Sequence, residues 1–333
     1  MKALINKMLV LAIASVTLMF AAPAARAQFS SQLEEKTIPV GEFTALDVSD
    51  DFEVTLAHGS CGAKVVVDKL LAPYVQVYVR SKVLYIMYDS KAVPKDVRQV
   101  YKRREASKPV FRVSVSTHEL TSISLRDNVV LNCMDELGSK LSTEIELADK
   151  AQIKNLSINS NSVSVSLKKS SQATLAIRAV SKVDLRTEGN SSLKANVDAH
   201  DIISNAKGSS DMVITSVAEN ATLSSSGSSK SGVSFKGSKA VVTISGTSDL
   251  QLSGTGEKLT VSGDKASSLD ASGFDVVDAD INLSGPVKVN ITVQQNLNAN
   301  LTGGSALYYS GTPTFTIGRI FKSTLAPYGT NSK

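Results

Sequence analysis

Five aspartates in the last third of the chain are the residues best suited to catalysis: Asp264, Asp270, Asp275, Asp278 and Asp280. Paired carboxylates can hydrolyse glycosidic bonds, and carboxylates with Ca²⁺ and a basic side chain can cleave acidic polysaccharides. Their short spacing predicts that they scatter around one turn of the chain, and no arginine lies among them. We therefore expect a solvated face and no catalytic residues. The alternative is a pectin lyase-like or hydrolase-like enzyme with an acidic groove.

The patterns typical of metal, cofactor and nucleophile chemistry are missing from the sequence. Asp211 and Asp249 can share one face, but two carboxylates separated by a coil of the chain do not make a calcium cage. No Gly-x-Ser-x-Gly elbow and no phosphate-binding loop occurs. The potential soft metal ligands are scattered: Cys61, Cys133, His58, His118 and His200. The sequence predicts no metal site, no cofactor and no catalytic residue.

The two cysteines leave two structural alternatives open. Cys61 and Cys133 lie far apart in the sequence. A disulfide bond between them is possible in an exported protein, where the environment is oxidising. Two buried free thiols are the other alternative, and the one that we favour.

A basic segment with neighbouring tyrosines is the candidate binding surface. Residues 91–108 carry seven Lys or Arg and two acidic residues. Arginine and tyrosine are common where binding energy concentrates, so these residues suit a glycan, lipid headgroup or protein partner at the cell envelope. The alternative is a solvated loop that only aids solubility. The candidate residues are Lys102, Arg103, Arg104, Tyr74, Tyr78, Tyr85, Tyr88 and Tyr101.

Short β-strands must hold this candidate binding surface in place. Apolar and polar residues alternate at period two in 43–48, 52–56, 64–67, 75–79 and 83–88. We expect residues 28–120 to form a β-rich N-terminal portion, with 91–108 inserted as a surface loop or short helix.

The remainder of the chain repeats. A small polar turn followed by an alternating strand recurs at nearly even spacing, with starts at 127, 149, 170, 190, 208, 228, 246, 265, 285 and 303. This period predicts an all-β fold, a right-handed parallel β-helix or β-solenoid with about 20 residues per coil over 121–317, and a tail over 318–333. A β-sandwich is the alternative. Alternation places Leu252, Phe235 and Phe274 inside the coils.

The first residues predict export. A basic start, an apolar run over 8–22 and Ala25-Arg26-Ala27 are typical of a cleaved signal peptide over 1–27, with a membrane anchor as the alternative. We expect a periplasmic, outer-membrane-associated or extracellular protein without a transmembrane span in its mature chain. Without Lys2, Lys7 and Arg26 the formal charge falls from +5 to +2, which does not favour nucleic-acid binding.

Three segments carry a family resemblance. They run from Phe43 to Leu56, from Phe111 to Leu125 and from Leu297 to Pro313, the last containing Gly303-Gly304-Ser305-Ala306-Leu307-Tyr308-Tyr309. Over roughly residues 37–317 the chain resembles the head GIN domain of putative autotransporter adhesins, a secreted Bacteroidetes domain. The resemblance implies a β-helical extracytoplasmic adhesin-like or scaffold protein and brings no catalytic residues. Asp50-Asp51, Asp127-Asn128 and the long basic insertion depart from the family pattern.

Overall fold

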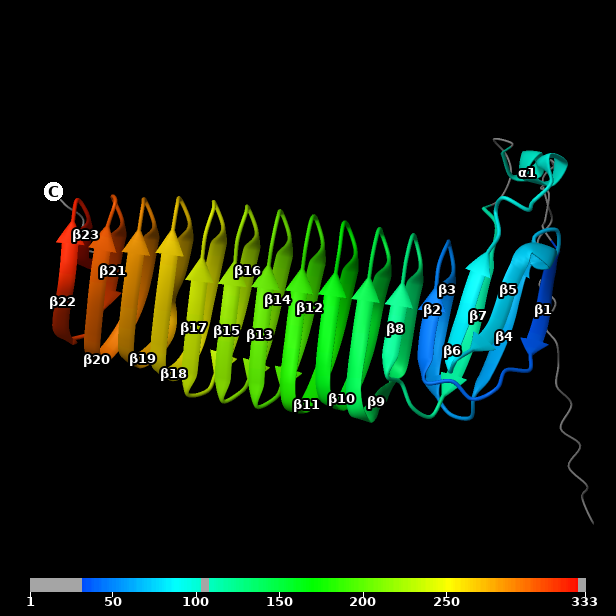
Figure 1. Ribbon diagram of the computed structural model, residues 1–333, viewed down its shortest axis with the longest axis horizontal. Helices are drawn as coiled ribbons and strands as arrows, with labels where there is room; N and C mark the ends of the chain where they lie inside the picture. The colour runs from blue at the N-terminus through cyan, green and yellow to red at the C-terminus, as the bar shows by residue number, and fades with distance from the viewer. Residues whose placement is uncertain (1–31, 103–107, 329–333) are drawn as a thin grey trace, which may run out of the picture.

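The protein is a rod of stacked β-coils (Figure 1). The computed structural model describes residues 32–102 and 108–328, and in them the chain makes about 11 turns of roughly 19 residues each. This arrangement confirms the predicted β-solenoid. The segment 1–27, in which we expect a signal peptide, lies outside the described residues.

The elements near the N-terminus include the strands of the first coils and their cap. They are β1 (Leu33–Ile38), β2 (Ala45–Val48), β3 (Glu53–His58), β4 (Gly62–Asp68), the 3-10 turn η1 (Ala72–Tyr74), β5 (Val75–Arg80), β6 (Val83–Tyr88), α1 (Lys95–Lys102), β7 (Phe111–Thr117) and β8 (Ser122–Leu125).

The strands that follow form the rest of the rod. They are β9 (Val130–Leu147), β10 (Gln152–Leu167), β11 (Gln172–Thr187), β12 (Ser192–Asp198), β13 (Asp201–Ala206), β14 (Asp211–Val217), β15 (Asn220–Ser225), β16 (Lys230–Lys236), β17 (Lys239–Ile244), β18 (Asp249–Asp264), β19 (Ser268–Ser284), β20 (Lys288–Thr302), β21 (Ala306–Ser310), β22 (Thr314–Phe321) and β23 (Thr324–Pro327).

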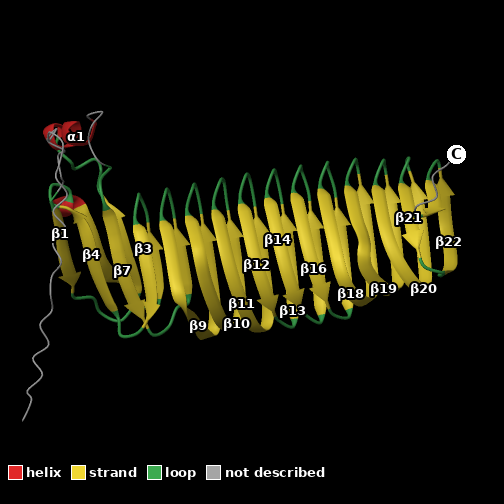
Figure 2. Ribbon diagram, turned by 180° about the vertical axis from the view of Figure 1, so that it is seen from behind, coloured by secondary structure: helices red, strands yellow, loops and turns green. Residues whose placement is uncertain are grey.

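Each coil crosses two sheets. The first sheet contains β1, β4, β7 and β3 and continues through β12, β14 and β16 to β23 (Figure 2). The second contains β5, β6, β2 and β8 and continues through β13, β15 and β17 to β22 (Figure 1). The long strands β9, β10, β11, β18, β19 and β20 bend through both. The coils pair in parallel, as predicted, whereas β1, β4 and β5 pair antiparallel at the N-terminal end.

Aliphatic columns between the two sheets form the core. Leu250, Leu269, Val289 and Leu307 are register partners in successive coils, and each is at most 1% exposed. Burial of such side chains stabilises each coil by roughly 25 cal/mol per Å² of apolar surface. Leu252, Phe235 and Phe274 are also buried, which confirms the inward positions that alternation predicted.

One ridge of the rod is made of tight turns, and two sequence features build it. Each turn contains a residue with positive φ, for which Gly, Asp and Asn are the best suited. In five of the turns a buried serine follows, and its hydroxyl donates to a carbonyl three residues earlier, as Ser191 does to Glu188 at 2.7 Å and Ser248 to Ser245 at 2.9 Å. The positive-φ residues are Asp50, Asp127, Asp149, Lys169, Gly189, Gly208, Gly227, Gly246, Lys265, Gly285 and Gly303.

The solenoid extends beyond the limits expected from the sequence. Residues 45–58 already form a coil, because β2 and β3 pair in parallel with β8 and β9. At the other end β22 and β23 pair with β20 and β21, so residues 318–327 continue the rod where we expected a tail.

Candidate functional site

The basic insertion takes the place of one turn of the ridge. Strands β6 and β7 flank the β2–β3 coil, and the chain between them carries α1 in place of a tight turn. Figure 1 shows α1 projecting beyond the row of turns at the N-terminal end of the rod. The predicted surface loop or short helix is therefore an eight-residue helix.

Helix α1 has one face against the protein and one face in solvent. Val97 and Tyr101 are half-buried and pack against the core, whereas Lys95, Arg98 and Lys102 are exposed. Within the described part of the chain, no ion pair joins these three cations to an acidic residue. Their charges are thus available to a partner.

Tyr101 fixes the helix over a buried carboxylate. Its hydroxyl lies beside Asp68 of β4, which is 1% exposed, although the two groups make no hydrogen bond of ordinary geometry. Burial raises the pKa of Tyr101 far above its usual value, and the Asp68 carboxylate raises it further. Tyr101 therefore stays protonated and acts as a neutral anchor for the helix.

Two more of the predicted tyrosines pack against the core near the N-terminal end of the rod. Tyr74 and Tyr88 are half-buried against the core, and the Tyr88 ring lies 4.7 Å from the Phe111 ring, measured between centroids. Burial, followed by the nearby Asp50 carboxylate, raises the pKa of Tyr88. The rings of Tyr74 and Tyr88 are therefore partly covered by the protein.

Tyr78 and Tyr85 form an aromatic pair on the outer face of the second sheet. They are register partners in β5 and β6, and their rings stack with centroids 5.3 Å apart at 22°. Tyr78 is 41% exposed. Asp47 of β2 is the next residue in the same row and forms an ion pair of 2.7 Å with Arg126. Burial raises the pKa of Asp47, and Arg126 partly opposes that rise.

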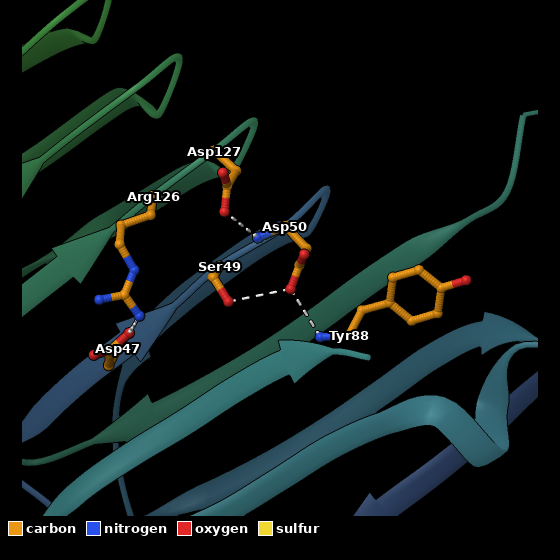
Figure 3. Close-up of polar contacts among 6 residues, drawn as sticks. All are labelled: Asp47, Ser49, Asp50, Tyr88, Arg126 and Asp127. Atoms are coloured by element: carbon orange, nitrogen blue, oxygen red, sulfur yellow. Dashed lines mark hydrogen bonds and ion pairs between the residues drawn. The ribbon is translucent and has the colours of Figure 1, made fainter. Parts of the chain in front are cut away.

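A carboxylate network attaches the insertion to the neighbouring turns (Figure 3). Asp50 accepts hydrogen bonds from the backbone N–H of Tyr88 at 2.9 Å and from the Ser49 hydroxyl at 3.1 Å. Asp127 in turn accepts from the backbone N–H of Asp50 at 3.2 Å. Asp50 therefore fixes the backbone at Tyr88, the last residue of β6.

Six of the eight predicted residues are described by the structure, and they occupy two places. Tyr78 and Tyr85 lie on the outer face of the second sheet. Tyr74, Tyr88 and Tyr101, the last of them in α1 itself, pack against the core, and Lys102 is exposed at the end of the helix. Arg103 and Arg104 lie outside the described residues.

Sequence reasoning missed Asp47, Asp50, Arg98 and Arg126. A comparison of residues 43–56 with 120–133 could have found the network, because Asp50 and Asp127 hold the same position in two coils of the rod.

The five C-terminal aspartates do not form one groove. Asp278 and Asp280 lie on the second sheet, whereas Asp270 and Asp275 lie on the first. Over residues 32–102 and 108–328, no three His, Cys, Asp or Glu side chains are grouped to hold a metal ion. Cys61 is half-buried, Cys133 is buried, and both thiols are free. No helix in the described ranges is long and apolar enough to cross a membrane.

Comparison with known proteins adds a family and several solved structures. The family described as putative auto-transporter adhesin, head GIN domain, matches residues 42–230 and 205–313. A putative adhesin from Parabacteroides merdae ATCC 43184 is 17% identical, with 90% of this chain and 97% of that chain covered and a TM-score of 0.35. No curated protein matches the chain.

Two structures from Parabacteroides distasonis ATCC 8503 give similar values. A putative adhesin is 18% identical with a TM-score of 0.33, and 90% of this chain and 98% of that chain are covered. A putative lipid binding protein is 15% identical with a TM-score of 0.31, and the coverage is 90% and 97%.

Proposed function

Since the chain belongs to the family of putative auto-transporter adhesins with a head GIN domain, we propose that it is a non-enzymatic attachment protein of the cell envelope. It is exported and uses the rod as a rigid spacer. The N-terminal end makes the contact, and its partner is an acidic glycan of the envelope.

The observation that carries this proposal is the replacement of a turn by α1 at one end of the rod. Lys95, Arg98 and Lys102 project from this end without acidic partners among the described residues, and the Tyr78–Tyr85 pair lies on the adjoining second sheet. Ammonium and guanidinium groups suit the carboxylates and phosphates of acidic glycans. Exposed aromatic rings suit the C–H faces of sugars.

The test compares two triple variants in binding to purified envelope polysaccharide. Lys102→Ser, Arg103→Ser and Arg104→Ser together should weaken binding roughly tenfold or more, since each cation near an anionic surface contributes about 1 kcal/mol. Binding by the unaltered protein should also weaken as salt rises from 0.05 to about 0.5 M, because exposed charges are screened.

The matched control removes the same charge elsewhere on the turn ridge. Lys150→Ser, Lys168→Ser and Lys207→Ser together alter three exposed lysines and should leave binding unchanged. Equal loss in both triple variants would show a non-specific charge effect and contradict the proposal. Retention on anionic lipid vesicles, but not on polysaccharide, would replace the glycan with lipid headgroups.

A further inference from the structure

The C-terminal end of the rod leaves part of its core open. Figure 1 shows β22 and β23 at the end furthest from α1. Phe315, Ile317 and Ile320 of β22 continue the columns of three β20 residues that are at most 1% exposed. In the last coil these inward positions are 40–45% exposed, because within the described residues no further coil stacks on them. A solenoid needs a covering element at such an end, since each coil buries its apolar residues against its neighbours.

The outer edge of β22 also lacks a partner strand. Among the described strands, β22 pairs only with β20. Its other edge therefore presents backbone N–H and C=O groups that point away from the rod along its axis. The hydrocarbon of a membrane cannot satisfy such groups, whereas another β-strand can. The exposed apolar row and the open edge together favour a β-strand as the covering element.

The N-terminal end of the rod has a protection that β22 lacks. There β1 is the outer strand of the first sheet, since in the described part of the chain it pairs only with β4. Glu34 and Lys36 of β1 lie opposite two valines of β4 that are 3% exposed, so both charges occupy core-facing positions. Inward-pointing charges prevent a sheet edge from accepting a further strand. The core-facing positions of β22 carry no charge, so its edge remains open to pairing.

The apolar pattern of β22 is the same when it is read in either direction. The residue that follows Ile317 has no register partner in β20, so the three inward positions stay evenly spaced along the paired strand. In antiparallel pairing with a second copy, a twofold axis at Ile317 places this residue opposite its own copy. The same axis places Phe315 of each copy opposite Ile320 of the other. A second β22 therefore matches the first one at all three apolar positions.

The cations of the last coil lie away from this twofold axis. Arg319 and Lys322 both lie over the Phe321 ring, at 5.4 and 5.5 Å from its centroid. Phe321 is the last residue of β22, three paired positions from Ile317. The two copies of this cluster would thus lie roughly 20 Å apart, at opposite ends of the paired strands. Salt screens exposed charges over about 8 Å, so repulsion between the copies is weak.

We propose that two copies of the protein pair end to end through β22 in a twofold-symmetric dimer. The contact continues the second sheet as an antiparallel strand pair and covers the inward apolar residues of both last coils. The end of the rod measures roughly 25 by 20 Å, so each copy buries about 500 Å². This area is at the low end for a specific interface, which predicts a dissociation constant in the range of about 1 to 100 µM. The inference does not depend on the α1 surface, and it places two such surfaces at the far ends of one longer rod.

Sedimentation velocity of the purified protein between about 1 and 300 µM tests this pairing, and the fraction of dimer should rise across the range. Ile317→Lys should keep the protein monomeric, because it places a charge opposite its own copy in an apolar contact. Val213→Lys is the matched control, since Val213 is a 53% exposed apolar residue on the first sheet, and should leave dimerisation unchanged. A monomer at every concentration, or equal dimerisation by both variants, would overturn the proposal. Capture of the monomer by phosphatidylglycerol vesicles, lost in Ile317→Lys, would assign this end to a membrane and overturn it as well.

Disulfide crosslinking gives a second readout that does not require the contact to be broken. Directly opposed residues of antiparallel strands lie close enough for a disulfide bond, so oxidised Ile317→Cys should form covalent dimers. Phe315→Cys controls the register, since its two copies would lie roughly 13 Å apart along the strands and should stay separate. The unaltered protein, with its two free thiols, gives the background. Crosslinking of Phe315→Cys but not of Ile317→Cys would contradict the twofold pairing.

Discussion

Single glycines decide how closely the coils can approach one another. Gly254 lies in β18 at φ +114°, and a Cβ atom there would lie 2.0 Å from the carbonyl oxygen of Phe235 in the preceding coil. Gly232 in β16 has no atom within 4 Å of the corresponding position and no positive φ. The same residue type is therefore required at one position and optional at the other.

We predict that Gly254→Ala destabilises the protein by roughly 2–4 kcal/mol, because the methyl group meets backbone and the φ value is strained for alanine. Gly232→Ala should change stability by less than about 0.5 kcal/mol, since the site is open and lies in a strand. Urea unfolding followed by circular dichroism measures both. Equal stability of the two variants would show that the coils can move apart at no cost.

At the residue level, the sequence correctly predicted which side chains are buried, but it did not predict which residues of different coils contact each other. Alternation at period two placed Leu252, Phe235 and Phe274 inside, because the period follows from the strand itself. The role of Gly254 depends on the carbonyl of another coil, and the use of Asp50 depends on the position of Tyr88. Neither can be read from neighbouring residues in the chain.

Among the elements, β18, β19 and β20 are joined by a charged row on the second sheet. Asp280 forms an ion pair of 2.8 Å with Lys258 and accepts from the Asn298 amide. The Lys258 hydrogen bond, followed by that of Asn298, holds the pKa of Asp280 below its usual value. A carboxylate with a depressed folded-state pKa stabilises the fold above its unfolded pKa of about 3.9 and loses that contribution as the pH falls through the folded value.

Asp280→Asn should therefore lower stability by roughly 0.5 kcal/mol at pH 7, and the difference from the unaltered protein should shrink as the pH falls below about 3.9. Melting temperatures between pH 2 and 7 test this. Asp275→Asn on the first sheet is the control for removal of one exposed negative charge. A deficit for Asp280→Asn that persists unchanged at pH 2 would mean that the carboxylate contributes through packing and not through its charge.

The strands that could be predicted from the sequence are those that pair with a strand of the next coil along the chain. The turn signal returned at each coil, so the parallel pairing from β9 to β20 was predictable. The β2–β3 coil was missed because its next partner along the rod, β8–β9, comes much later in the sequence, beyond the cap strands and α1. The last coil was missed because a register shift between Ala299 and Asn300 interrupts the pattern in β22.

The whole molecule has two unlike ends. Antiparallel strands and α1 close the N-terminal end, whereas Phe315, Ile317 and Ile320 of the last coil remain 40–45% exposed. About 11 coils at a spacing of ~4.8 Å separate the two ends by roughly 50 Å. The α1 surface and the last coil are thus too far apart to contact the same small ligand.

Parallel pairing between coils also determines how the rod carries mechanical load. The backbone hydrogen bonds between coils run along the long axis of the rod, and the first and last described strands, β1 and β23, lie at its opposite ends (Figure 1). A pull applied through the chain ends detaches the outermost coil first and breaks its bonds one after another. In single-molecule stretching we expect repeated low-force steps of roughly 60 Å, the extended length of about 19 residues. One rupture that releases the whole length would mean that the coils fail as one unit. An attachment protein built in this way lengthens in stages under flow and dissipates the pull before its outer contacts are lost.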